Sequence, residues 1–123
     1  MKTEIYLKSK HDDSFDAKAV YIDGHVIVKS GSIIRTSFAT YVRGGRAAKK
    51  AREDRSIVSA EGIVLKDCTF NSPSTSAQFV MGSSVNGWTA WHVSEKENLK
   101  QYLEKQTVSE RYAKFQDVLE KIK

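Results

Sequence analysis

Alternating apolar positions predict strands in the first quarter of the chain. Thr3–Leu7 has the pattern of a short strand, and residues 17–23 alternate in the same way. Residues 25–29 are rich in valine and isoleucine. Between these two runs, Asp23-Gly24 predicts a two-residue turn because both residue types tolerate positive φ. We therefore expect an antiparallel β-hairpin here.

A first helix is predicted at Arg46–Ser56, directly after the flexible Gly44-Gly45 pair. At about 100° per residue, Ala47, Ala51 and Val58 fall on one side of this helix. The other side is basic. A narrow seam of small residues lets such a helix approach its neighbour closely.

A second helix is predicted from Ser72-Pro73 to Gly82. Ser72 suits the N-cap position and Pro73 the first helical position, and Gly82 suits the position that ends the helix. Val80 belongs to its apolar side, and Phe79 is expected nearer the flank.

Asn86-Gly87 predicts a second hairpin turn, of type I′, followed by a strand at residues 88–93. Trp88 and Trp91 are three positions apart, so on a regular strand they face opposite sides. One is then expected in the core and the other at the surface or under a C-terminal helix. Trp88 is the candidate for stacking on a nucleobase, and core packing is the alternative.

Two capping-box patterns, Ser94–Glu97 and Thr107–Glu110, predict two consecutive C-terminal helices. The second carries an apolar stripe at spacings of three and four. This stripe can fold back on the domain, or it can form a homodimer seam or a docking surface for a protein partner. Its residues are Tyr112, Phe115, Leu119 and Ile122. We predict a domain at residues 1–103 and an amphipathic helix at 104–123.

Together these elements predict an α+β fold. We expect a largely antiparallel sheet that carries helices on one face, with a helical C-terminal extension. Two hairpin signals and irregularly placed helices argue against a doubly wound parallel sheet.

Composition limits the class of protein without defining its chemistry. The 123 residues are 40% hydrophobic and 28% charged, which is typical of a globular domain. A single cysteine, Cys68, excludes an internal disulfide. The first residues lack the apolar run of a signal peptide, and no stretch approaches the ~18–20 apolar residues of a membrane span. We therefore expect a soluble, cytoplasmic protein with no membrane partner.

Positive charge is concentrated in one short segment. Residues 43–55 hold six basic residues against two acidic ones, a net +4 of the formal +5 of the whole chain. Such a concentration indicates a polyanionic partner, and a nucleic-acid backbone laid along a basic helix face is the functional interpretation. A solvated basic face is the alternative. The candidate phosphate contacts are Arg43, Arg46, Lys49, Lys50, Arg52 and Arg55.

Candidates for catalysis are few. His11-Asp12-Asp13 has metal-ligand residue types, but it lies in a polar stretch that is typical of a loop. His25 and His92 have no acidic partner at a recognisable spacing, and Cys68 fits a small structural hydrophobe. No Gly-rich phosphate loop or two-cysteine metal site is present in the sequence. We expect no catalytic residues, no metal and no cofactor.

Several segments in a fixed order resemble one family. They are DGHVIVKSGS at 23–32, GIVL at 62–65, FNSPSTSA at 70–77, VMG at 80–82 and NGWTAW at 86–91. This order resembles a domain-of-unknown-function family that is often found at the C-terminal end of GIY-YIG nuclease-like and restriction-associated bacterial proteins. The stretch from the Ser-Pro-Ser to the second tryptophan also resembles the restriction enzyme adenine methylase associated (RAMA) domain. The resemblance covers roughly residues 17–103.

The resemblance implies work near DNA modification, cleavage or defence, and the family has no established catalytic residues to carry over. With the basic segment, it leads to the expectation of a non-catalytic nucleic-acid-binding accessory module, with DNA favoured as the partner. The alternative is a protein-interaction adaptor that uses the C-terminal helices. Neither expectation includes a sequence preference, because phosphate contacts position a protein without specifying bases.

Overall fold

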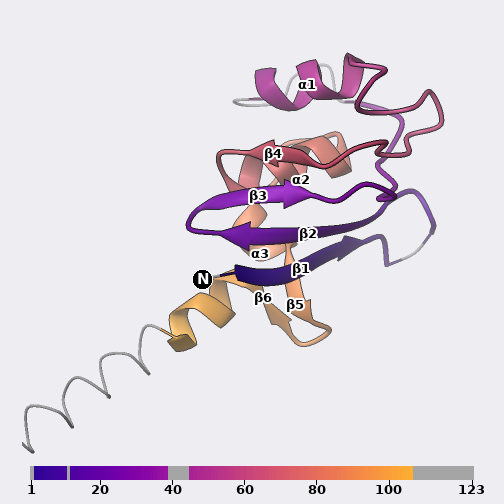
Figure 1. The fold of residues 1–123 in the computed structure, drawn as a ribbon. Helices are drawn as coiled ribbons and strands as arrows, with labels where there is room; N and C mark the ends of the chain where they lie inside the picture. Colours follow the sequence, from indigo (N-terminus) through magenta and orange to yellow (C-terminus); the bar gives the residue numbers. More distant parts are fainter. Residues whose placement is uncertain (1, 11, 39–44, 107–123) are drawn as a thin grey trace, which may run out of the picture.

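An antiparallel sheet organises the described part of the chain, residues 2–10, 12–38 and 45–106, in the computed structural model (Figure 1). Its strand order is β4-β3-β2-β1-β5-β6, and each neighbouring pair is antiparallel. The strands are β1 (Lys2–Lys8), β2 (Asp16–Ile22), β3 (His25–Val28), β4 (Cys68–Phe70), β5 (His92–Ser94) and β6 (Glu97–Asn98). The helices are α1 (Arg46–Glu53), α2 (Pro73–Met81) and α3 (Gly87–Ala90), and residues 99–106 are also helical.

This architecture confirms the mixed α+β class and the antiparallel sheet. The predicted C-terminal extension from Thr107 onward lies outside the described residues. The division into residues 1–103 and 104–123 stays a prediction. Within the described residues, none of the helices has the length and apolarity that crossing a membrane requires.

The predicted hairpin joins β2 and β3. Ile22 pairs with His25, which leaves Asp23 and Gly24 as the two-residue turn. Their φ angles are 47° and 89°, in the left-handed region that glycine adopts without strain and aspartate tolerates. Local backbone preference therefore fixes this turn, as the sequence predicted.

One face of the sheet packs against helices. Ile5 and Leu7 of β1 are buried on this face, as are Val26 and Val28 of β3. Figure 1 shows α2 and α3 behind the sheet and α1 beyond the β4 edge. Successive side chains of a strand point to opposite faces, so the alternating apolar residues share the face that the helices cover.

Helix α2 begins and ends where its residues predict. The Ser72 Oγ accepts a hydrogen bond from the Thr75 N–H at 3.1 Å, and Pro73 occupies the first turn. Gly82 ends the helix in the left-handed conformation, and its N–H donates to the Gln78 carbonyl at 2.8 Å. These caps satisfy backbone groups that a helix end leaves without intrahelical partners.

The position predicted for Phe79 near the flank of α2 is wrong. Its side chain is fully buried, with its ring centroid 4.9 Å from that of Phe70. The reason is that α2 is covered on several sides, since it contacts α1 and α3 as well as β3 and β4. A helix enclosed in this way buries positions that a one-sided amphipathic helix would leave at its flank.

The hairpin predicted at Asn86-Gly87 is also wrong. The Asn86 Oδ1 accepts a hydrogen bond from the Trp88 N–H at 3.0 Å, so Asn86 caps a helix. Residues 87–90 are consequently helical rather than extended, and β5 begins only at His92. Tertiary contact supports this choice, because the Gly87 N–H donates to the Ser74 Oγ at 3.0 Å.

The expected division of the two tryptophans is confirmed, although not on a strand. Trp91 is fully buried, and its Nε1–H is shared between the Pro73 carbonyl at 3.2 Å and the Ser76 Oγ at 3.0 Å. Trp88 is 36% exposed. A buried indole requires a hydrogen-bond acceptor, and α2 supplies both of these.

The capping box predicted at Ser94–Glu97 is a strand turn instead. Ser94 pairs with Glu97 across β5 and β6, with two residues between them. The helix over residues 99–106 is capped by Asn98, four positions after the predicted cap Ser94. The Asn98 Oδ1 accepts from the Gln101 N–H at 2.9 Å, and the Gln101 Oε1 accepts from the Asn98 N–H at 3.0 Å. This reciprocal pair is a capping box in geometry, with asparagine and glutamine as its members.

Candidate nucleic-acid interface

The basic helix forms as α1, but its buried side is rotated from the predicted one. Ala48 and Ala51 are buried, whereas Ala47 is exposed. Arg52 is half-buried and completes a stripe at spacings of three and four. Val58 is buried too, although it lies after the helix has ended at Glu53. The seam predicted at Ala47, Ala51 and Val58 is therefore wrong in register.

Arg52 anchors α1 to the rest of the fold. Its Nη1 donates to the Phe79 carbonyl, and its Nη2 donates to the carbonyls of Arg35 and Ser37, the last at 2.9 Å. The guanidinium also lies over the Phe38 ring, 5.1 Å from its centroid. Because the guanidinium donors face these carbonyls, Arg52 holds the helix in place rather than projecting into solvent.

The contact with Phe79 has a clear physical reason. Phe79 lies in the last turn of α2, where carbonyls have no intrahelical partner and the helix dipole favours a cation. Burial, together with the smaller effect of the nearby charge of Arg35, lowers the pKa of Arg52 to about 10. At neutral pH the side chain therefore remains charged, as its contacts with carbonyls require.

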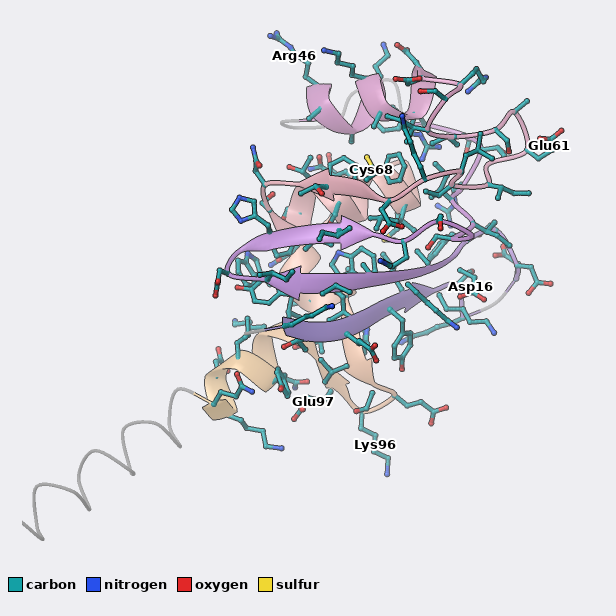
Figure 2. The ribbon with its side chains drawn as sticks, in the orientation of Figure 1. Asp16, Arg46, Glu61, Cys68, Lys96 and Glu97 are labelled. Atoms are coloured by element: carbon teal, nitrogen blue, oxygen red, sulfur yellow. The ribbon has the colours of Figure 1, made fainter. Side chains whose placement is uncertain are left out.

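Four of the predicted phosphate contacts are exposed. Arg46, Lys49 and Lys50 lie on α1, and Arg55 follows it. Figure 2 shows Arg46 pointing away from the body of the protein at the start of α1. Arg55 is partly engaged, since its Nη1 donates to the Arg52 carbonyl at 3.1 Å.

Among the described residues, the exposed basic side chains of α1 form no salt bridge. The ion pairs between described residues join Lys29 to Asp67 and Lys105 to Glu97, and neither involves α1. The first turn of α1 holds no acidic residue. Arg46 there adds its charge to the positive end of the helix dipole, an arrangement that costs helix stability and raises the local positive potential.

A small hollow of about 200 Å³ lies beside this helix. Lys49, Arg52 and Arg55 line it together with Arg35, and Glu53 is the one acidic residue among its lining residues. Arg35 lies outside the basic segment predicted from the sequence. Its position here depends on tertiary pairing, since its N–H donates to the Val80 carbonyl of α2 at 2.9 Å, and no local pattern could have indicated it.

The predicted stacking residue, Trp88, lies away from α1. Trp88 packs edge-on against Tyr21, with ring centroids 6.0 Å apart. It belongs to α3, which Figure 1 shows behind the sheet and away from α1. Arg43 and the stripe from Tyr112 to Ile122 lie outside the described residues.

The side chains considered for chemistry are dispersed. Cys68 is half-buried on β4, and burial raises the pKa of its thiol. Within the described part of the chain, no three histidine, cysteine, aspartate or glutamate side chains are grouped as a metal site would require. Asp12 accepts hydrogen bonds from Ser14 and Ser9, which lower its pKa to about 2, as in an ordinary polar turn.

The fold and the basic helix define an α+β domain with one strongly charged edge. The chain belongs to the family described as domain of unknown function (DUF4357), whose model matches residues 6–103. No curated protein and no solved structure matches the chain.

Proposed function

We propose that this protein is a non-catalytic nucleic-acid-binding module that holds the phosphate backbone against α1, with DNA as the favoured partner. The observation that carries the proposal is that the basic residues of α1 have two different roles. Arg52 fixes the helix to the domain, while Arg46, Lys49 and Lys50 remain exposed. A rigidly held cationic face contacts phosphates at a lower entropic cost than a mobile basic segment.

The family resemblance of the sequence supports a setting for this activity. It favours an accessory role beside restriction-modification, nuclease or defence proteins of bacteria. In that setting the module would add affinity for the backbone, and a partner would supply the chemistry and the sequence specificity.

Salt dependence of binding tests the proposal. Three phosphate contacts predict that log affinity for duplex DNA falls against log salt with a slope of about −2.7. The triple variant Arg46→Gln/Lys49→Gln/Lys50→Gln should bind much more weakly and show a slope near zero in fluorescence-anisotropy titrations. Weaker binding with an unchanged slope would indicate a cause other than the loss of phosphate contacts.

A matched control removes the same charge elsewhere. Lys2, Lys96 and Lys100 are exposed, and Figure 2 shows Lys96 pointing away from the fold at the turn between β5 and β6. Their triple change to glutamine should leave most of the affinity and the slope intact. A parent protein that binds neither duplex nor single-stranded oligonucleotides would instead favour the adaptor function of the C-terminal helices.

A further inference from the structure

A second and larger hollow, of about 730 Å³, opens between the end of β1 and α3. Leu7 and Phe15 contribute buried apolar surface to it, and Met81, Val85 and Ala90 contribute half-buried surface. Its volume lies in the range of about 300–1,000 Å³ that is typical of small-molecule sites. The hollow is therefore large enough for a planar ring system.

The helical conformation of residues 87–90 creates this space. β1 and β5 are paired at Tyr6 and His92, and the chain before His92 turns away as α3 instead of continuing along β1. Leu7 and Lys8 of β1 and Thr89 of α3 consequently line the same hollow. A strand at residues 88–93, as predicted from the sequence, would have filled it.

Charge around the hollow is mainly positive. Lys8, Lys10 and Arg35 are among its lining residues, against one acidic residue, Glu95. The Arg35 guanidinium lies over the Phe15 ring at 5.0 Å from its centroid, so an aromatic wall and a cation are held together. A guanidinium held in this way can pair with a phosphate beside the apolar wall.

Hydrogen-bond acceptors complete the lining. The His92 Nδ1 lies 2.8 Å from the Ala90 carbonyl, which can only accept, so Nδ1 carries the proton. The Glu95 carboxylate, also in the lining, can accept hydrogen bonds from the N–H groups on the edge of a base.

Arg35 connects this hollow to α1. It also lines the smaller hollow beside the basic helix, and its carbonyl accepts from Arg52. The two hollows therefore share Arg35, and each has a lysine among its lining residues, Lys49 in the first and Lys8 in the second. A backbone bound on α1 thus has Arg35 as a cation between the helix and the apolar hollow.

We propose that the larger hollow binds an unpaired nucleobase together with its phosphate. The inference rests on the proposed function, because α1 would bind the backbone of the same nucleic-acid strand that carries the base. The half-buried side chains of Met81, Val85 and Ala90 would contact the base, and Lys8, Lys10 and Arg35 would neutralise its phosphate. Single-stranded DNA is then bound through α1 and the hollow, whereas fully paired DNA is bound through α1 alone.

Two variants test the hollow without touching α1. Ala90→Phe fills the apolar space, and Lys8→Gln/Lys10→Gln removes charge from the rim. Each should weaken the binding of a single-stranded oligonucleotide about tenfold or more, Ala90→Phe through the lost base contact and the rim variant through the lost phosphate contacts, and leave duplex affinity within about twofold. Lys96→Gln/Lys100→Gln is the charge-matched control for the rim variant and should change neither affinity.

A fluorescent base gives a second readout. A single-stranded oligonucleotide with one 2-aminopurine should change its emission on saturation by the parent, and this change should be lost with Ala90→Phe. Should Ala90→Phe fail to fold by circular dichroism, the exposed rim variant carries the test. Unchanged single-strand affinity in a folded variant, or a parent that binds no single strand, overturns the inference.

The α1 triple variant shows whether the hollow proposal or the proposed function of α1 has failed. If it weakens duplex binding while the hollow variants leave single-strand binding unchanged, the hollow proposal alone is wrong. If it leaves duplex binding unchanged while the hollow variants weaken single-strand binding, the backbone role of α1 is wrong and the base site stands on its own.

Discussion

The guanidinium of Arg52 and the carbonyl of Phe79 join the basic helix to the end of α2. One hydrogen bond thereby caps a helix C-terminus and fixes the orientation of the charged face. A residue from the most basic segment of the chain is used inside the fold, and its neighbours Arg46, Lys49 and Lys50 are left outside. Structure and proposed function depend on the same eight-residue helix.

The first prediction concerns Arg52 itself. Arg52→Gln removes the donors to three backbone carbonyls, and an acceptor left unsatisfied in a buried site costs about 1–3 kcal/mol. We expect the free energy of unfolding in urea to fall by at least about 2 kcal/mol. Arg46→Gln, an exposed change of the same type, should alter it by no more than about 0.5 kcal/mol.

DNA binding separates the two roles of these arginines. Arg46→Gln should weaken duplex binding without affecting stability. If Arg52→Gln keeps its full stability and loses affinity, Arg52 contacts phosphate and does not anchor the helix.

The second prediction concerns Gly87, where the backbone of α3 approaches α2. A Cβ at this position would overlap the carbonyl group of Pro73, which belongs to backbone and cannot move aside cheaply. Gly87→Ala should therefore destabilise the protein by about 3 kcal/mol or more, the upper end of the cost of overpacking. Thermal unfolding followed by circular dichroism measures the loss.

Gly24 provides the comparison for this prediction. A Cβ there meets nothing within 4 Å, so Gly24→Ala carries only the strain of a positive φ, about 1–2 kcal/mol. An equal loss at both positions would mean that close packing at Gly87 contributes nothing, and that the helical assignment of residues 87–90 lacks its main support.

Turns governed by backbone preference could be predicted from the sequence. Asp23-Gly24 needs positive φ, and Ser72-Pro73 starts a helix through its own side chain and ring. Each of these two features depends on residues within four positions of one another, so the local sequence is enough to predict it. The antiparallel α+β class followed from such signals.

Features that depend on distant contacts could not be read in this way. Asn86 suits both a type I′ turn and a helix N-cap, and the Ser74 hydroxyl from another element favours the cap. The register of α1 depends likewise on Arg52 reaching Phe79, 27 positions away. The larger hollow follows from the first of these choices, so its residues were not identified as a site.

The third prediction concerns Cys68, which the sequence analysis interpreted as structural. Burial raises the pKa of its thiol, so a smaller fraction is thiolate at pH 8 than for an ordinary cysteine. Iodoacetamide should therefore label the native protein more slowly than the urea-unfolded chain at the same pH, and the native rate should keep rising at pH values where the unfolded rate has levelled off.

A substitution completes the test of Cys68. Cys68→Ala should cost at most a few kcal/mol of stability and leave DNA affinity unchanged. Rapid labelling of the native thiol accompanied by loss of binding would contradict the structural interpretation and indicate a reactive role.

The last prediction concerns the apolar stripe of Tyr112, Phe115, Leu119 and Ile122, which the sequence places on one face of a helix. Full burial stabilises such side chains by about 1.5–3 kcal/mol each, so we expect them to cover an apolar surface. Deleting residues 107–123 distinguishes the candidate surfaces. If the helix folds back, the shortened chain loses thermal stability at every protein concentration. If it forms a homodimer seam, the full-length chain elutes at twice its mass and its melting temperature rises with concentration. A full-length monomer whose stability is unaffected by the deletion would exclude both, and the stripe would then be the surface through which the adaptor alternative operates.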